Sequence, residues 1–420
     1  MEGSSTKSIV LSYATFHVPV LLRSSRPEFV RLHDYGDMVH TRTRNYGQAA
    51  KSEVCARQET QIERRQRWAN LLQQQHYYPV ILEVLSEELP KHQTSTLIDT
   101  KDRISHIREC ALILASAPLV LAAAVDGNLI THLLIKADLQ KEYTLILDQA
   151  HHQPSIYLHF LADSYGAAPT PNQYMTIRSM IQDYLAEGST SQHAHHLDNI
   201  TPPTVSQSQS SLGHRKYLQT CHRSSARIDT LRRFCAGIQR RWTETPPYLR
   251  DTPMAFPPGE CGYSKTSHIR MAQHRAHQSS NYVMNLVEDI CTYLHRTKQF
   301  VQHFIMHQFI ICLIFRPQQA AIAEIFCSGL LQVWVDDGGG FNAYPAGRSV
   351  ATAGRVSAEE WEGYGRWVRR HSGLEGNLRV QREKSDEWRR ALDGESGVDV
   401  EMLEGLDSGV DDGQEDGGDY

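Results

Sequence analysis

The chain has 420 residues, enough for two or three domains with hydrophobic cores of their own. Its hydrophobic content of 40% is slightly low for a globular protein, so part of the chain is expected to be linker or tail. The net charge of −5 conceals an asymmetry, because residues 393–420 hold 11 acidic side chains and no lysine or arginine, which leaves +6 on the rest. A mildly basic body permits contact with nucleic acid, and the acidic, Gly-rich tail is expected to be disordered.

The eight cysteines are scattered and form no C-x-x-C pair. This pattern argues against a disulfide framework or a zinc ribbon and favours reduced thiols in an intracellular compartment, cytoplasmic or nuclear. The N-terminus lacks the basic region and long apolar core of a signal peptide. Residues 1–50 show no clear period and are expected to be poorly ordered.

Residues 51–187 are expected to form a helical domain, which could bind partner proteins. Helical patterns cover residues 51–75, 79–89, 102–125 and 171–187. The apolar run within 102–125 is about 15 residues long and contains Pro118, whereas a membrane span needs about 20 residues. A buried helix broken near Pro118 is the better interpretation, and no membrane partner is expected. Residues 143–147 fit either a strand or a helical turn.

Residues 188–213 are rich in Ser, Thr, Gln and Pro and predict a linker. His193, His195 and His196 within it could bind a metal, although they lack acidic or cysteine partners nearby. Residues 214–392 are expected to form a second, α/β domain.

An Arg-rich amphipathic helix is predicted to open this second domain, within residues 214–250. Arg240 and Arg241 are its candidate contacts to the phosphates of a nucleic acid. The alternative is a helix that docks on the C-terminal core and leaves its arginines in solvent.

Strands are predicted at residues 260–264, 300–315 and 332–335, with helices between them. Together with the helical first half, this order predicts an α+β protein with a small sheet. Gly338, Gly339 and Gly340 are expected to form a turn, because no Lys-Ser or Lys-Thr follows them as in a phosphate-binding loop.

The densest collection of reactive side chains follows the first of these strands. A helix is predicted from about His268 past Leu286, with Arg270, His274, His277 and Asn281 on one stripe at steps of 4, 3 and 4. Such a stripe could bind a phosphate or assist proton transfer. The alternative is a solvated helix face.

Gly262, Tyr263 and Ser264, followed by Arg270 and His274, resemble the second strand and first helix of GIY-YIG nuclease domains. Ala320, Ala321 and Glu324 resemble the family's later A-x-x-E helix, so that the resemblance covers residues 246–340. It implies catalytic roles for Arg270, His274 and Tyr263, and a divalent metal such as Mg²⁺ held by Glu324. Glu260 stands where the family has its second-motif tyrosine, and the segment just upstream offers only Tyr248 as a first-motif tyrosine.

Two functions follow from these observations. One is a GIY-YIG-like module associated with nucleic acid, whether catalytic or degenerate. The other is a non-catalytic scaffold that binds partner proteins through its helical domain.

Overall fold

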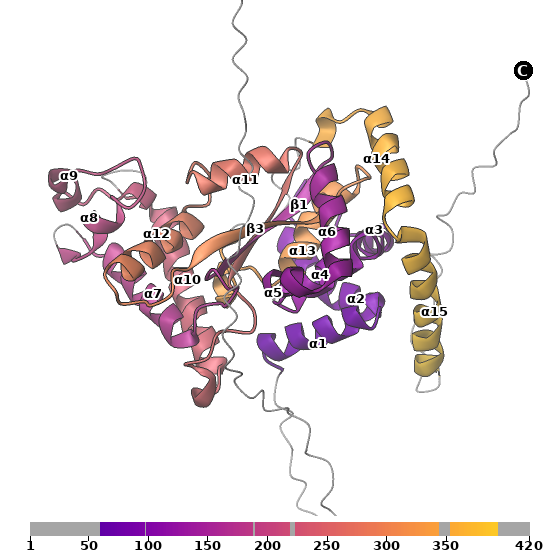
Figure 1. Cartoon of the computed structure of the whole chain (residues 1–420), viewed down its shortest axis with the longest axis horizontal. Helices are drawn as coiled ribbons and strands as arrows, with labels where there is room; N and C mark the ends of the chain where they lie inside the picture. Colours follow the sequence, from indigo (N-terminus) through magenta and orange to yellow (C-terminus); the bar gives the residue numbers. More distant parts are fainter. Residues whose placement is uncertain (1–58, 97, 188–189, 219–222, 344–352, 394–420) are drawn as a thin grey trace, which may run out of the picture. The chain divides into compact units, whose positions relative to one another are not determined.

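The computed structural model describes residues 59–96, 98–187, 190–218, 223–343 and 353–393 (Figure 1). The expectations for residues 1–50 and for the acidic tail beyond residue 393 lie outside this part of the chain. The described residues are mostly helical and contain a three-stranded antiparallel sheet, which confirms the α+β class.

Helices fill the chain before the first strand. They are α1 (Gln61–Gln73), α2 (Tyr77–Glu88), η1 (Leu89–His92), α3 (Arg103–Ser116), α4 (Pro118–Val125), α5 (Leu129–Ile135) and α6 (Ala137–Gln149). Thr60 begins α1 with a capping box, in which its hydroxyl accepts the N–H of Glu63 and the Glu63 carboxylate accepts that of Thr60. Pro118 opens α4, so the predicted break is confirmed, and residues 143–147 are helical.

The two apolar helices on either side of Pro118 are bent by 98° relative to each other. Among the described residues no single helix is long and apolar enough to cross a bilayer, while α3 and α4 together have the length and composition of one broken span.

The sheet consists of β1 (Ser155–Ala162), β2 (Gly259–Ser264) and β3 (Ile305–Leu313), in the order β2-β1-β3. The predicted strands near residues 260–264 and 300–315 are confirmed. The strand expected at 332–335 is wrong, because Trp334 makes only an isolated bridge to Asn342 and Val335 begins a 3-10 turn. The central strand β1 comes instead from the half of the chain expected to be mainly helical.

The chain between β1 and β2 forms α7 (Pro171–Tyr184), α8 (Ala194–Leu197), α9 (Gln207–Ser211), η3 (Lys216–Leu218), α10 (Ser225–Glu244) and η4 (Pro247–Leu249). The segment expected to be a linker contains α8 and α9, and its Leu197 and Asp198 are buried. The Asp198 carboxylate accepts hydrogen bonds from the Tyr184 hydroxyl (2.6 Å) and from the backbone N–H of Lys216 (3.1 Å). The polar composition of the segment gave no indication that these few residues are buried. The described residues on both sides of the segment belong to one compact unit.

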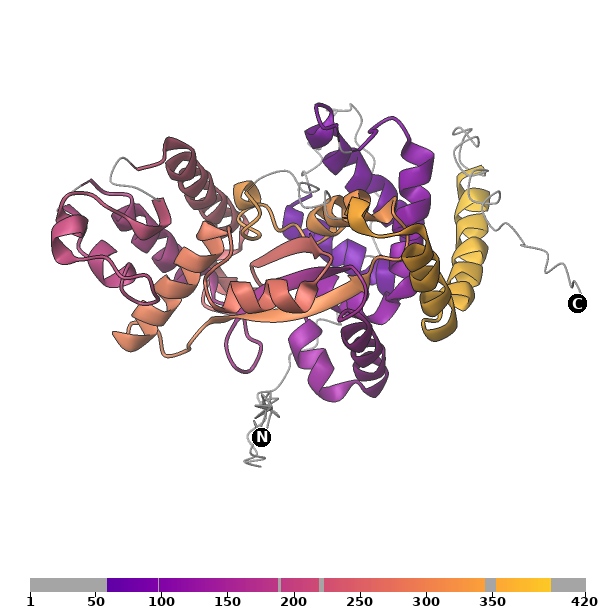
Figure 2. The same cartoon turned by 90° about the horizontal axis from the view of Figure 1, so that it is seen from above.

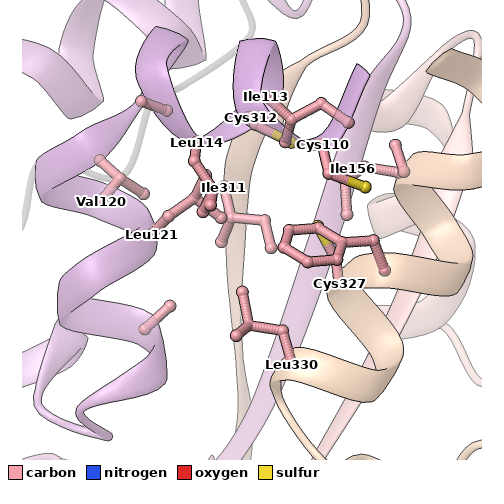
Figure 3. Close-up of a cluster of buried hydrophobic side chains, with 14 of the residues drawn as sticks. Cys110, Ile113, Leu114, Val120, Leu121, Ile156, Ile311, Cys312, Cys327 and Leu330 are labelled. Carbon is pink, nitrogen blue, oxygen red and sulfur yellow. The ribbon is translucent and has the colours of Figure 1, made fainter. Parts of the chain in front are cut away.

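Two large hydrophobic clusters form most of the core. The larger joins α1–α4 and α13 (Gln319–Leu330) to the sheet, and Figure 3 shows Cys110 of α3, Leu121 of α4 and Cys327 of α13 meeting at Ile156 of β1 and Cys312 of β3. The second cluster joins α7, α10 and α12 (Tyr282–Arg296). The sheet contributes to both clusters, and therefore joins the two helical groups.

The C-terminal part of the described chain contains η5 (Val335–Asp337), α14 (Ala358–His371) and α15 (Leu374–Asp393). The last two helices lie next to each other in Figures 1 and 2, and α15 also packs against α3. The predicted turn at Gly338–Gly340 is a point of close backbone approach. A Cβ on Gly340 would lie 1.9 Å from the carbonyl oxygen of Gly259, and one on Gly338 would lie 2.4 Å from that of Gly237.

Candidate functional site

Polar side chains gather on one face of β1 and β2. Tyr157 and His159 are two residues apart on β1, and they pair directly with Gly262 and Glu260 on β2. Because alternate residues of a strand share a face and paired residues stand opposite each other, these side chains point the same way. All of them are buried.

Helix α11 (Ser267–Arg275) covers this face and packs against all three strands (Figure 1). The Ser267 and Ser155 hydroxyls form a 2.6 Å hydrogen bond that joins the start of the helix to β1. Arg270 and His274 are one turn apart, so both reach toward the sheet. The His274 ring lies 4.6 Å from that of His159 and 5.5 Å from that of Tyr157, measured between centroids.

The single long helix predicted through this stretch is wrong. Helix α11 ends at Arg275, and His277 adopts a left-handed conformation with φ of 53°. Asn281 then caps α12, because its side chain accepts the N–H of Met284. His277 and Asn281 therefore leave the expected stripe, whereas Arg270 and His274 remain together.

The imidazole of His159 and the carboxylate of Glu260 form a close polar contact, with 2.6 Å between Nδ1 and Oε2. Burial opposes ionisation of Glu260, but attraction to His274 and the contact with His159 outweigh it and keep the pKa of the carboxyl below its usual range. Burial also lowers the pKa of His274 to about 4, so that this ring is neutral near pH 7.

Arg270 links the tyrosine to the acidic groups. Its guanidinium is half-buried and interacts with the Tyr157 hydroxyl. Burial and the charge of Glu260 raise the pKa of Tyr157 well above its usual value, so the phenol keeps its proton. For Arg270, burial opposes the charged form, but the attraction of Tyr157, Glu260 and Glu324 raises its pKa.

Glu324 reaches the site from α13, which packs against the edge strand β2. It is 8% exposed. Burial is the main cause of the raised pKa values of Tyr157 and Cys261, and the negative charge of Glu324 adds to both, as it does to the raised pKa of Arg270. Glu324 therefore acts electrostatically on Arg270, although the two are 54 positions apart.

Two of the predicted site residues do not belong to this site. Tyr263 pairs with Ile156, so it points to the opposite face of the sheet and lies in the larger hydrophobic cluster. Arg241 is buried, and its guanidinium donates hydrogen bonds to the carbonyls of Gly338 and Phe256, so it is bound within the fold and is not a surface contact for a phosphate. Arg240 is 55% exposed, 3.4 Å from the Asp337 carboxylate.

Sequence reasoning missed Tyr157 and His159. The available signal was the run Ser-Ile-Tyr-Leu-His-Phe-Leu-Ala, which is rich in strand-forming residues and follows Pro154. Tyr248, the tyrosine considered instead, is 80% exposed and lies in η4.

Comparison of the chain with family models, with curated proteins and with solved structures finds no match in any of the three.

Proposed function

We propose that this chain is a GIY-YIG-like module that acts on the phosphodiester backbone of nucleic acid. The observation that carries the proposal is the meeting of Tyr157, Arg270, His274 and Glu324, which come from β1, α11 and α13. The resemblance to the GIY-YIG family implies a site built from a tyrosine, an arginine, a histidine and a carboxylate. Ser155-Ile156-Tyr157 on the strand beside β2 supplies the counterpart of the first motif.

The roles follow from the chemistry of each group. Arg270 is the most exposed of the four and carries the positive charge that a phosphate needs. Tyr157 is held by Arg270 and can donate its phenol proton to a phosphate oxygen. His274 is neutral near pH 7 and can accept a proton from an attacking water.

The donor set also fits a divalent cation. Glu260 and Glu324 are two buried carboxylates beside one guanidinium, so the site holds an excess of negative charge when both are ionised. A divalent ion held by Glu324 would offset that excess and stabilise the negative charge that develops on phosphorus oxygens. Glu260 stands where the family has a tyrosine. Its negative charge would repel a bound phosphate, and a divalent cation would offset that repulsion.

The test is cleavage of a mixed DNA and RNA panel with Mg²⁺ or Mn²⁺ by the full chain. We expect Glu324→Gln and Arg270→Ala each to lower the rate at least about 100-fold. Arg275→Ala is the matched control, since Arg275 is an exposed arginine of the same helix that hydrogen-bonds Gln308, and it should cleave like the wild type.

Three other outcomes separate the alternatives. Loss of cleavage in Arg275→Ala as well would contradict the assigned roles. Binding that weakens steeply with salt, without cleavage by the wild type, would mean a degenerate module, and Arg240→Ala would then lower the salt slope by about 1 if Arg240 contacts a phosphate. Neither cleavage nor binding would favour the scaffold that binds proteins through its helices.

An intracellular location, cytoplasmic or nuclear, accompanies this proposal. The six cysteines in the described part of the chain are all free thiols, which suits a reducing compartment.

A further inference from the structure

The proposed reaction gives no role to His159, although its ring lies in the same buried polar cluster as Glu260 and His274. His159 and Glu260 face each other on adjacent strands, and His274 reaches them from α11. Each of the three offers one ligand atom, a ring nitrogen or a carboxylate oxygen, and these atoms all lie within 4.8 Å of one another. The exposed fractions of the side chains are 0% for His159, 8% for Glu260 and about 1% for His274.

Ring nitrogens in this cluster lack hydrogen-bond partners. Among the described residues, nothing accepts from or donates to Nε2 of His159 or to either nitrogen of His274. A buried polar atom left without a partner costs about 1–3 kcal/mol, and native proteins contain few of them. Each neutral ring offers one nitrogen lone pair, so two neighbouring rings beside a carboxylate point to a ligand that takes one lone pair from each.

We propose that His159, Glu260 and His274 bind one divalent transition-metal ion of the zinc class. Two imidazole nitrogens and one carboxylate oxygen suit Zn²⁺ and its neighbours in the first transition row better than Mg²⁺ or Ca²⁺, which prefer oxygen ligands alone. This donor set differs from the single carboxylate of Glu324, and binding of the ion does not depend on the proposed function. An ion bound to His274 would take up the lone pair of that ring and so replace the proton-accepting role proposed for it.

The geometry needs little adjustment. In a tetrahedral site with metal–ligand bonds of about 2.0–2.1 Å, the ligand atoms lie about 3.3 Å apart. The observed limit of 4.8 Å is within a small side-chain movement of that value. Two of the ligands stand on paired strands, which hold them in fixed relation.

A site with three protein ligands keeps at least one position of the metal open. The Tyr157 ring lies 5.5 Å from that of His274, measured between centroids, and Arg270 attracts the Glu260 carboxylate. A water or an anionic oxygen is therefore the fourth ligand that this surrounding favours.

The experiment is titration of the full chain, first stripped with a chelator, with Zn²⁺ and with Co²⁺. We expect one ion per chain and a cobalt spectrum of nitrogen and oxygen ligands, without the intense charge-transfer absorption of cobalt thiolates. His274→Phe keeps an aromatic ring in place and removes no hydrogen bond, since the His274 ring makes none. It should weaken binding more than the 10–100-fold typical of losing a supporting residue.

Glu260→Gln is the second variant, because its amide oxygen can still accept a hydrogen bond from His159 while its affinity for the metal falls. Zn²⁺ should raise the unfolding temperature of the wild type and not that of His274→Phe. Unchanged affinity in both variants, absence of binding, or a thiolate spectrum would overturn the assignment.

The control is the double variant His195→Gln with His196→Gln, which removes the other histidine cluster and should bind Zn²⁺ like the wild type. Zinc binding is measured without nucleic acid. A result that rejects the zinc site is therefore distinct from one that rejects cleavage of nucleic acid. Binding through the three residues in a chain that cleaves nothing keeps the metal site and contradicts the nuclease.

Discussion

Gly262 leaves room for Tyr157 where β1 pairs with β2. A Cβ at this position would lie 2.4 Å from the Tyr157 hydroxyl oxygen and 2.6 Å from its ring carbon Cζ. Since Tyr157 is buried, it cannot swing freely away. We predict that Gly262→Ala lowers the free energy of unfolding by about 1–3 kcal/mol in a urea titration and displaces the tyrosine from Arg270.

Gly363 provides the matched control. It lies inside α14, and a Cβ added to it would have no atom within 4 Å, so Gly363→Ala should raise stability by about 0.5–1 kcal/mol through helix propensity alone. Equal effects of the two substitutions would contradict the crowding assigned to Gly262.

Glu142 gives a prediction about pH. Its carboxyl oxygen accepts the N–H groups of Leu119 and Val120 at the start of α4 (2.9 and 2.8 Å), yet burial raises its pKa to about 7. The folded protein thus keeps a proton that the unfolded chain loses above pH 4.5, so stability falls as pH rises from about 4.5 to 7. We expect a loss of about 1–2 kcal/mol across this window.

Glu142→Gln cannot ionise and keeps an oxygen acceptor for both N–H groups. Its unfolding temperature should therefore fall less than that of the wild type between about pH 5 and pH 7.5. These two pH values span the range over which the Glu142 carboxyl loses its proton. Parallel curves for the two proteins would show that Glu142 does not titrate between these values.

Some residues of the site could be predicted from the sequence and others could not. The spacing within one local motif indicated Arg270 and His274, which are indeed neighbours on α11. Tyr157 and His159 depend on pairing with a strand about 100 residues away, and no local pattern encodes that partner. Tyr263 belonged to the motif, but strand alternation turns it to the opposite face.

Among the secondary-structure elements, α1 depends on one buried arginine. Arg65 donates hydrogen bonds to the carbonyls of Ala124, Val125 and Leu331, so it satisfies the C-terminal ends of α4 and α13. We predict that Arg65→Met lowers the free energy of unfolding by about 3–5 kcal/mol, because it leaves these carbonyls buried without donors.

Arg232→Met is the control for Arg65→Met. Arg232 is 71% exposed, and its contact with Asp229 is a surface pair, so the change should stay within about 0.5 kcal/mol in the same denaturant titration. A similar cost for both variants would mean that the carbonyl contacts of Arg65 contribute little.

Local signals predicted the helices well and the strands less well. Prolines and capping residues act on adjacent backbone, so they indicated the start of α4 at Pro118 and of α7 at Thr170 with Pro171. The break at His277 was missed because a left-handed backbone is uncommon for residues other than glycine, and no glycine or proline stands at this point of the sequence. The strand β1 was missed because helices precede and follow it and its partners are remote in sequence.

At the scale of the whole molecule, the reactivity of the buried cysteine thiols depends on whether the core remains packed. Cys110, Cys235, Cys261, Cys291, Cys312 and Cys327 are all buried free thiols. Burial raises the pKa of several of them, including Cys235 to about 11, and only the thiolate reacts readily. We predict that these six stay unreactive toward a thiol reagent in the native protein and become reactive together in denaturant.

The measurement is a count of modified cysteines by mass spectrometry along a denaturant series. Reaction of the six in separate steps at different denaturant concentrations would show that the two hydrophobic clusters unfold independently. A single transition is expected because the sheet contributes side chains to both.

The position of β1 in the middle of the sheet also sets the order of events during synthesis. Its neighbours begin at Gly259 and Ile305, so β1 leaves the ribosome roughly 100 residues before any strand can pair with it. At typical rates of about 5–20 residues per second, this apolar strand waits about 5–20 s without a partner. Nascent chains halted in this interval should therefore be the ones that chaperones hold and that aggregate when released.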